Sequence, residues 1–248
     1  MRSTIRLILF TISLIVGWNS PHINALEKKT LHNQNHFLIH YPRTFNQENR
    51  YPILMALHGM SEYTKPTCKK WQPVADTYNY ILICPIGNHH IKGYLRYPFD
   101  ERKGFIEILD HYDKKHKIDL SRSILVGFSK GGNLAIETAL MFPNKIKNAI
   151  SIFGFYTRFN QNILKNRPNK TVFGNSNILL ITGKTDPTYS SITNGHNILN
   201  DHNIRTKLVA YNHKTHSYPE PLPVFFEKAQ KWLYKKKSPS AKNNYQLC

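Results

Sequence analysis

Short apolar runs alternate along this chain with segments in which apolar residues recur at helical spacing. Continuous apolar runs of four to eight residues are typical of strands that are buried on both faces of a parallel sheet. The expected strands lie at 51–57, 81–84, 124–126, 146–155, 178–182 and 207–211, with a looser edge strand at 36–41. The expected helices lie at 71–78, 105–112, 134–140, 189–199 and 224–234.

Strands that alternate with helices predict an α/β fold, a doubly wound and mostly parallel sheet with helices on both faces. Residues 26–34 are polar, and we expect them to form a flexible lead-in. Residues 157–176 are polar and basic, contain Pro168 and Gly174 and show no regular period. We therefore expect a loop or a small cap between the strands on either side of this segment.

The first residues follow a different pattern. Arg2 and Arg6 precede an apolar run at 7–18, and a small residue, Ala25, follows a polar stretch. This order is typical of a secretory signal peptide that is cleaved after Ala25, although Ile23 suits that cut less well than alanine. An uncleaved anchor is the alternative, but the run is short for a membrane span. We expect a signal peptide at 1–25, one domain at 26–236 and a basic, disordered tail at 237–248.

Export, to the periplasm or outside the cell, would permit a disulfide. Of the three cysteines, Cys68 precedes the helical pattern at 71–78 and Cys84 ends the strand at 81–84. Both positions are expected at the carboxyl edge of the sheet, so their geometry allows a bridge, and two free buried thiols are the alternative. No cysteine has the spacing of a metal ligand.

Composition limits the chain to one sizeable core, because 40% of its 248 residues are hydrophobic. The formal net charge is +19, from 34 Lys and Arg against 15 Asp and Glu. Such a charge is an electrostatic footprint that nucleic-acid-binding proteins share, but no recognition motif accompanies it here, so we expect no nucleic-acid partner. The expected surface is solvated and basic, open to attraction by anionic envelope polymers or lipid head groups.

One strand-to-helix junction carries chemistry, because residues 127–131 read Gly-Phe-Ser-Lys-Gly, a G-x-S-x-G motif. Strand, motif and helix in this order are typical of a nucleophile elbow, where a strained serine projects above the sheet edge. Gly127, Gly131 and Gly132 supply the side-chain-free positions that such a close approach requires. The helix start directs N–H groups and partial positive charge toward Ser129. We predict Ser129 as a nucleophile; a glycine-rich turn with an incidental serine is the alternative.

A serine nucleophile needs a histidine to take its proton, and the histidine needs a carboxylate to hold its tautomer. In the hydrolase arrangement they follow in the order serine, acid, histidine, each past the carboxyl end of a strand. Asp186 is the best acid, with an ordinary turn aspartate as the alternative and Asp201 as a fallback. His213 and His216 both follow the last strand, and we favour His216 because it has the longer reach over Ser129.

The tetrahedral intermediate of acyl transfer needs two N–H donors for its oxyanion. We expect one from Lys130, the residue after the nucleophile, and the other from the Met60 amide in the loop that follows His58. His58 itself is expected to be structural, since no second metal ligand is spaced with it. The adjacent histidines at 89–90 point in different directions, so we expect no metal and no other cofactor.

Several motifs share the positions that α/β-hydrolases use for catalysis: Leu57-His58-Gly59, Ile118-Asp119 with Ser121-Arg122, Val126 to Gly132, Gly183 with Asp186, and His216 with Tyr218-Pro219. Over residues 36–234 the chain resembles that superfamily. The nearest likeness is to secreted esterases related to poly(3-hydroxybutyrate) depolymerases and feruloyl esterases. The small phospholipase/carboxylesterase and dienelactone-hydrolase-like groups come close behind. In one departure, Lys130 stands where many relatives carry Gln, Ala or Met.

The resemblance implies a secreted serine esterase that forms an acyl-enzyme, with a small or polymer-bound ester as its substrate. Peptide or thioester hydrolysis would use the same residues, and a non-catalytic binding protein of the cell envelope is the remaining alternative. A basic segment at 157–176 with no Asp or Glu, together with Lys130, also predicts a preference for esters that carry negative charge near the scissile bond.

Overall fold

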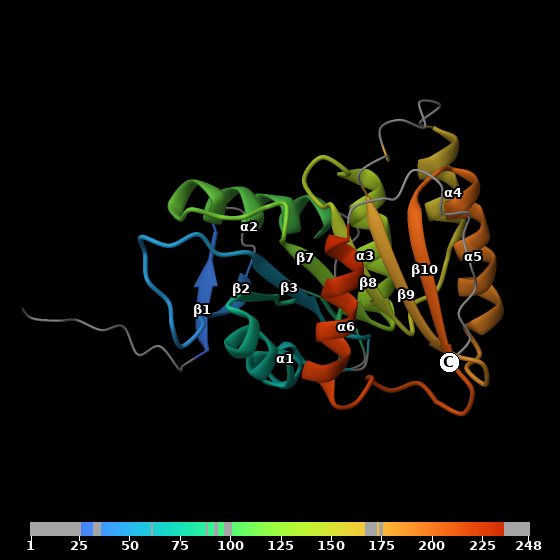
Figure 1. The fold of residues 1–248 in the computed structure, drawn as a ribbon, viewed down its shortest axis with the longest axis horizontal. Coiled ribbons are helices and arrows are strands. Elements are labelled where there is room, and N and C mark those ends of the chain that lie inside the picture. The colour runs from blue at the N-terminus through green and yellow to red at the C-terminus, as the bar shows by residue number, and fades with distance from the viewer. Residues whose placement is uncertain are drawn as a thin grey trace, which may run out of the picture.

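A computed structural model describes residues 26–31, 36–60, 62–87, 89–91, 94–96, 101–166, 173 and 176–235. The expected signal peptide and the whole of the expected tail lie outside these residues. Eight strands form one twisted sheet in the order β1-β2-β4-β3-β7-β8-β9-β10, flanked by helices (Figure 1). No helix of the described part is long and apolar enough to cross a membrane. The α/β fold predicted from the alternation of strands and helices is confirmed.

The strands of the main sheet are β1 (Glu27–Thr30), β2 (His36–His40), β3 (Ile53–Leu57), β4 (Ile81–Pro85), β7 (Ile124–Phe128), β8 (Asn148–Ile152), β9 (Asn177–Gly183) and β10 (Arg205–Tyr211). β1 and β2 are antiparallel to their neighbours, whereas every pair from β4 to β10 is parallel. The carboxyl ends of the parallel strands therefore meet at one edge, where open α/β sheets bind their ligands.

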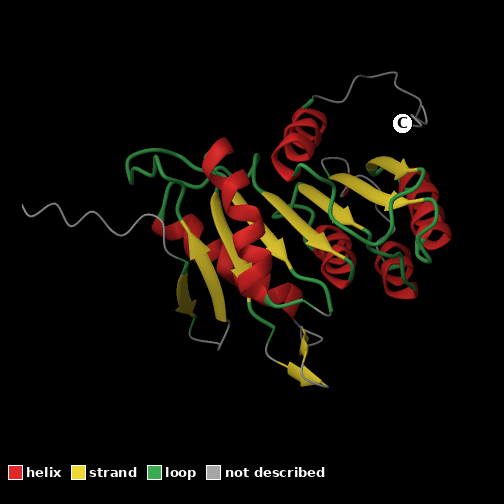
Figure 2. Cartoon of the chain, turned by 90° about the horizontal axis from the view of Figure 1, so that it is seen from below, coloured by secondary structure: helices red, strands yellow, loops and turns green. Residues whose placement is uncertain are grey.

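Helices cover both faces of this sheet, as Figure 2 shows. They are α1 (Thr64–Tyr78), α2 (Glu101–Lys115), α3 (Lys130–Met141), α4 (Arg158–Lys165), α5 (Tyr189–Asp201) and α6 (Leu222–Tyr234). Apolar residues of α1 and α6 pack in one core cluster, and those of α2, α3, α4 and α5 pack in another. A small hairpin of β5 (His89–Ile91) and β6 (Tyr94–Arg96) stands apart from the main sheet.

The two core clusters explain why the central strands read as unbroken apolar runs. In β3, Ile53 and Met55 face the cluster under α2 and α3, while Leu54 and Ala56 face the cluster under α1 and α6. All four side chains are at most 1% exposed. Alternate residues of a strand point to opposite faces, so a strand that is covered on both faces needs apolar residues at every position.

The amino-terminal strands correct two expectations. Within the segment expected to be a flexible lead-in, residues 27–30 form β1, which pairs with β2. β2 is therefore an inner strand of the sheet rather than its edge. β1 escaped detection because an edge strand keeps most of its side chains in solvent, and three of its four residues are exposed. Such a strand carries no hydrophobic pattern.

Two helices were missed or shortened. α4 lies within 157–176, where no period was recognised, and Thr157 caps it through a reciprocal pair of hydrogen bonds with Asn160. This capping box uses Asn instead of the usual Glu or Gln, which concealed the signal. α1 begins at Thr64, because Pro66 fits a first helical turn and Pro73 is tolerated within the helix. Cys68 thus lies inside the helix rather than before it.

Candidate active site

Ser129 connects β7 to α3 in a strained backbone conformation, with φ 52° and ψ −117°. Residues other than glycine rarely adopt a positive φ, and strain of this kind gathers at functional sites. Its N–H donates to the Ile152 carbonyl oxygen at 2.8 Å, and its own carbonyl accepts from the Asn133 N–H at 3.1 Å. The serine is half-buried, so its hydroxyl lies at the sheet edge within reach of a substrate.

Glycines around Ser129 allow strand and helix to meet. A Cβ atom on Gly127 would lie 2.1 Å from the Gly131 carbonyl oxygen, and one on Gly131 would lie 2.5 Å from the Leu57 carbonyl oxygen. Both distances are far below van der Waals contact. The turn that strains Ser129 therefore requires glycine at these two positions, as the motif predicted.

The structure joins Asp186 and His216. Asp186 follows β9, and its Oδ2 atom lies 2.8 Å from Nδ1 of His216. The Asp186 side chain is fully buried, whereas the His216 side chain is 40% exposed. Burial by itself would raise the pKa of Asp186, but hydrogen bonds from the Thr188 side chain, the Thr188 backbone N–H and His216 bring that pKa below its ordinary value. The carboxylate thus stays ionised and accepts the Nδ1 proton of His216.

The loop after β10 carries His216 toward Ser129. A Cβ on Gly183 would lie 1.8 Å from the Lys214 carbonyl oxygen, so this loop packs directly against the end of β9. The His216 ring lies 5.0 Å, centroid to centroid, from the ring of Phe128, the residue before Ser129. It also lies 5.4 Å from the Phe153 ring at the end of β8. Ser129, Asp186 and His216 therefore gather at one edge of the sheet.

The predicted oxyanion donors lie on either side of Ser129. Lys130 is the first residue of α3, and the first N–H groups of a helix have no partner within it. On the other side, a Cβ on Gly59 would lie 3.4 Å from Cβ of Ser129, which brings the loop of Met60 against the nucleophile. His58 is 1% exposed and its Nδ1 lies 2.8 Å from the Gly59 carbonyl oxygen, in keeping with a structural role.

His213 and Asp201, the alternatives to His216 and Asp186, are not part of the bonded pair. His213 is exposed in the loop after β10, and Asp201 is the exposed last residue of α5, at the opposite sheet edge from Ser129. Glu62 was not among the residues predicted from the sequence, and it accepts hydrogen bonds from the Gly59 N–H and the Tyr218 hydroxyl. Its only sequence signal is a carboxylate three residues after a glycine, which is common in turns.

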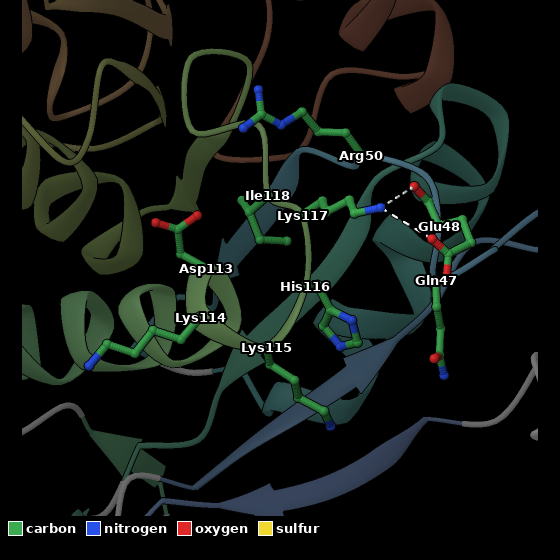
Figure 3. A pocket seen from close by; sticks show the side chains of 9 residues that line it. All are labelled: Gln47, Glu48, Arg50, Asp113, Lys114, Lys115, His116, Lys117 and Ile118. Atoms are coloured by element: carbon green, nitrogen blue, oxygen red, sulfur yellow. Dashed lines mark hydrogen bonds and ion pairs between the residues drawn. The ribbon is translucent and has the colours of Figure 1, made fainter.

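A hollow of about 690 Å³ lies away from Ser129, Asp186 and His216. Figure 3 shows its charged lining, in which Lys117 bonds to Glu48. Its residues precede β3 and β7 or end α2, so it opens at the amino edge of the sheet. The candidate active site is at Ser129, because the strained serine and the paired Asp186 and His216 are at the carboxyl edge. Within the described ranges, no three His, Cys, Asp or Glu side chains gather as metal ligands.

The fold is that of the α/β-hydrolases. A family model described as phospholipase/carboxylesterase matches residues 100–237, more than half of the 248 residues. The chain belongs to the phospholipase/carboxylesterase family, one of the groups that the sequence resembled. The resemblance to α/β-hydrolase esterases is thereby confirmed.

Individual relatives are more distant. A bifunctional acetylxylan esterase/xylanase of Neocallimastix patriciarum is 26% identical over 110 residues, which are 44% of this chain and 16% of that protein. A ferulic acid esterase structure has a TM-score of 0.70 at 14% identity, covering 84% of this chain and 96% of its own. The fluorophosphonate-binding serine hydrolase F of Staphylococcus aureus has a TM-score of 0.64 at 16% identity, covering 86% and 99%. At such identities the solved structures share the fold.

Proposed function

We propose that this protein hydrolyses carboxylic esters with Ser129 as nucleophile, His216 as general base and acid, and Asp186 as the group that orients His216. One observation carries the proposal: the Asp186–His216 hydrogen bond of 2.8 Å lies beside a serine that is held at a positive φ. A buried carboxylate on Nδ1 keeps the proton on that atom and leaves Nε2 as the base.

Acylation begins when Oγ of Ser129 attacks the ester carbonyl carbon and Nε2 of His216 takes the hydroxyl proton. The carbonyl oxygen becomes an oxyanion, which the N–H groups of Met60 and Lys130 stabilise. The C–O bond to the alcohol then breaks, and His216 gives its proton to the departing oxygen. An acyl group remains on Ser129, and Asp186 stays ionised throughout.

Deacylation repeats these steps with water. His216 removes a proton from the water as its oxygen attacks the acyl carbon, and the second tetrahedral intermediate forms at the same oxyanion site. Its collapse breaks the bond to Oγ, and His216 returns the proton to Ser129. The products are the alcohol and the carboxylic acid, with no cofactor consumed.

A small or polymer-bound carboxylic ester is the substrate class we propose. The names of an acetylxylan esterase and a ferulic acid esterase among the similar proteins support esters of this kind. Peptidase and thioesterase activity are alternatives on the same chemistry. Parallel assays with matched ester, thioester and amide substrates distinguish them, and we expect the highest kcat/KM for the ester.

We further propose that residues 1–25 direct export and are removed after Ala25, so that the mature enzyme is periplasmic or secreted. The bridge between Cys68 and Cys84 supports this proposal, because disulfides persist in oxidising compartments. Sequencing the amino terminus of protein recovered outside the cytoplasm tests the cleavage, and a chain that still begins at Met1 would contradict it.

Covalent labelling tests the proposed function most directly. A fluorophosphonate should label the folded enzyme once, on Ser129. Ser129→Ala should abolish the labelling and lower kcat by several orders of magnitude, while Tm stays near that of the wild type. Ser121→Ala, which removes an exposed hydroxyl at the opposite sheet edge, is the control and should label normally. Hydrolysis at the wild-type rate by folded Ser129→Ala would end the serine-esterase mechanism.

A further inference from the structure

The carboxylate of Glu62 joins the loop of Gly59 and Met60 (the oxyanion loop) to the loop that carries His216. Oε2 of Glu62 accepts a hydrogen bond from the Gly59 N–H at 2.7 Å and another from the Tyr218 hydroxyl at 3.1 Å. Gly59 immediately precedes Met60, and Tyr218 lies two residues after His216. The same oxygen atom therefore connects two segments that are 156 residues apart in the chain.

The aromatic partner of Glu62 is itself firmly placed. The Tyr218 ring stacks on the Phe128 ring with centroids 4.4 Å apart and planes 20° apart, and Tyr218 is 5% exposed. The Lys70 ammonium lies 4.1 Å from the centroid of the Tyr218 ring. Since Phe128 immediately precedes Ser129, the stack joins the histidine loop to the nucleophile strand as well. Three segments of the active site thus meet around Glu62 and Tyr218.

The hydrogen bond to Gly59 also determines which N–H is available for the oxyanion. Glu62 engages the Gly59 N–H, so that group is not offered to substrate. Fixing it orients the peptide that follows, whose N–H belongs to Met60. A hydrogen bond to a charged acceptor is about twice as strong as one between neutral groups. A carboxylate is therefore well suited to hold this glycine-containing loop against Ser129.

We propose that Glu62 is a positioning residue, which holds the Met60 N–H and His216 in register with Ser129. Glu62 acts through Gly59 and Tyr218 and needs no contact with substrate. The inference rests on the proposed esterase function. Its physical basis is that misplacing a catalytic group by about 1 Å can lower the rate by about a hundredfold.

Three substitutions test this role. Glu62→Ala removes both bonds and should lower kcat by about 10 to 100-fold while KM stays within about threefold. Glu62→Gln retains an oxygen that can accept from both donors, and should recover most of that loss. Tyr218→Phe keeps the stack on Phe128 but loses the hydrogen bond to Glu62. Its kcat should lie between those of Glu62→Ala and Glu62→Gln. Rates are expressed per site titrated with a fluorophosphonate, so that misfolded protein does not count.

A transition-state readout separates positioning from simple stability. A boronic acid that adds to Ser129 forms a tetrahedral adduct, so its affinity should fall in Glu62→Ala by about the same factor as kcat/KM. Glu220→Ala is the matched control, because Glu220 also accepts a backbone N–H, from Leu222 at 3.2 Å. It should leave kcat and boronic acid affinity at wild-type values.

Two results would overturn the inference. One is wild-type kcat per titrated site in Glu62→Ala, whatever happens to its Tm. The other, which decides the matter if Glu62→Ala does not fold, is wild-type kcat in Tyr218→Phe. Ser129→Ala keeps the two proposals separate: residual hydrolysis there defeats the esterase mechanism, whereas an inactive Ser129→Ala beside a fully active Glu62→Ala defeats only the role of Glu62.

Discussion

Two residues of the candidate site have strained backbone conformations. Ser129 holds a positive φ, and Phe153, at the end of the neighbouring strand β8, has φ 50° as well. Conformations of this kind cost about 1–3 kcal/mol each and persist where surrounding contacts enforce them. Here the N–H groups of both residues donate to the neighbouring strands, Ser129 to Ile152 and Phe153 to Ile181. The sheet thereby stabilises the turn that exposes the Ser129 hydroxyl.

The choice of histidine is testable at this scale. Both histidines are exposed in the loop after β10, but His216 bonds to buried Asp186. His216→Ala should therefore lower kcat about as far as Ser129→Ala does, and His213→Ala should change it less than about threefold. Steady-state kinetics on both variants gives the ranking. The reverse order would reassign the base to His213 and leave the serine mechanism in place.

A second residue-scale prediction concerns His58. Burial lowers its pKa from the ordinary 6.5, although the Gly59 carbonyl and Glu62 oppose that shift. Below about pH 6.5 the unfolded chain binds a proton that folded His58 resists, so acid lowers the free energy of unfolding. Between pH 7.5 and 5.5, the wild type should lose more stability than His58→Gln. Urea unfolding at each pH measures the free energy of unfolding. An equal loss of stability in the wild type and in His58→Gln would contradict this prediction.

Among the secondary-structure elements, α1 is joined to α6 by an aromatic contact and to the sheet by a disulfide. Trp71 of α1 packs edge to face against Phe226 of α6, with ring centroids 6.0 Å apart. Cys68 of α1 is bridged to Cys84 of β4, with their Cα atoms 5.8 Å apart. α1 directly follows the loop of Gly59 and Glu62, so these contacts fix the position of the end of that loop.

The bridge should contribute measurably to stability. It closes a loop with a sequence separation of 16. Constraining a loop of this length in the unfolded chain is worth about 3 kcal/mol. The double variant Cys68→Ala/Cys84→Ala should therefore be about that much less stable than oxidised wild type in urea unfolding, and a reducing agent should not affect it. Cys248→Ser is the control with the bridge intact. Equal stability of the double variant and oxidised wild type would contradict the expectation.

For the whole molecule, the net charge of +19 is not neutralised around the active site. Lys69, Lys70, Lys184 and Lys214 belong to elements or loops at the carboxyl edge of the sheet, and Lys130 follows the nucleophile. The carboxylate of Asp186 is engaged by His216 and Thr188, and that of Glu62 by Gly59 and Tyr218. The lysines at this edge outnumber these two carboxylates, which keep their negative charge, so an excess of positive charge is available to a substrate.

Only two of the four cations in the basic segment at 157–176 belong to described residues. Arg158 and Lys165 are exposed on α4, while Arg167 and Lys170 lie outside the described residues. Among its described residues, the segment between β8 and β9 contains the single short helix α4.

An ester that carries a carboxylate should be preferred over its neutral isostere. We expect kcat/KM to be about tenfold higher for the anionic ester at low salt, and the ratio to approach one as salt screens the charges. Lys70→Gln should reduce the ratio, whereas Lys115→Gln, at the opposite edge of the sheet, should not. Equal kcat/KM for both esters at every salt concentration would leave these lysines as ordinary surface.

The sequence by itself determined the features that depend on neighbours along the chain. The central strands were predictable because burial on both faces demands unbroken apolar runs, and Ser129 because Gly127 and Gly131 mark a tight strand-to-helix turn. The order of serine, acid and histidine pointed to Asp186. The helix of residues 158–165 was missed because it is only eight residues long and its cap is unusual, and the strand of 27–30 because an exposed edge carries no hydrophobic pattern.

Only the tertiary structure decided the contacts between distant segments. It paired Asp186 with His216, 30 residues further on, and bridged Cys68 to Cys84, which the sequence left undecided against two free thiols. It also brought Glu62 to Tyr218 across 156 residues. The physical reason is common to all three. Whether two polar or sulfur atoms meet depends on how loops leave neighbouring strands, and local composition does not encode that geometry.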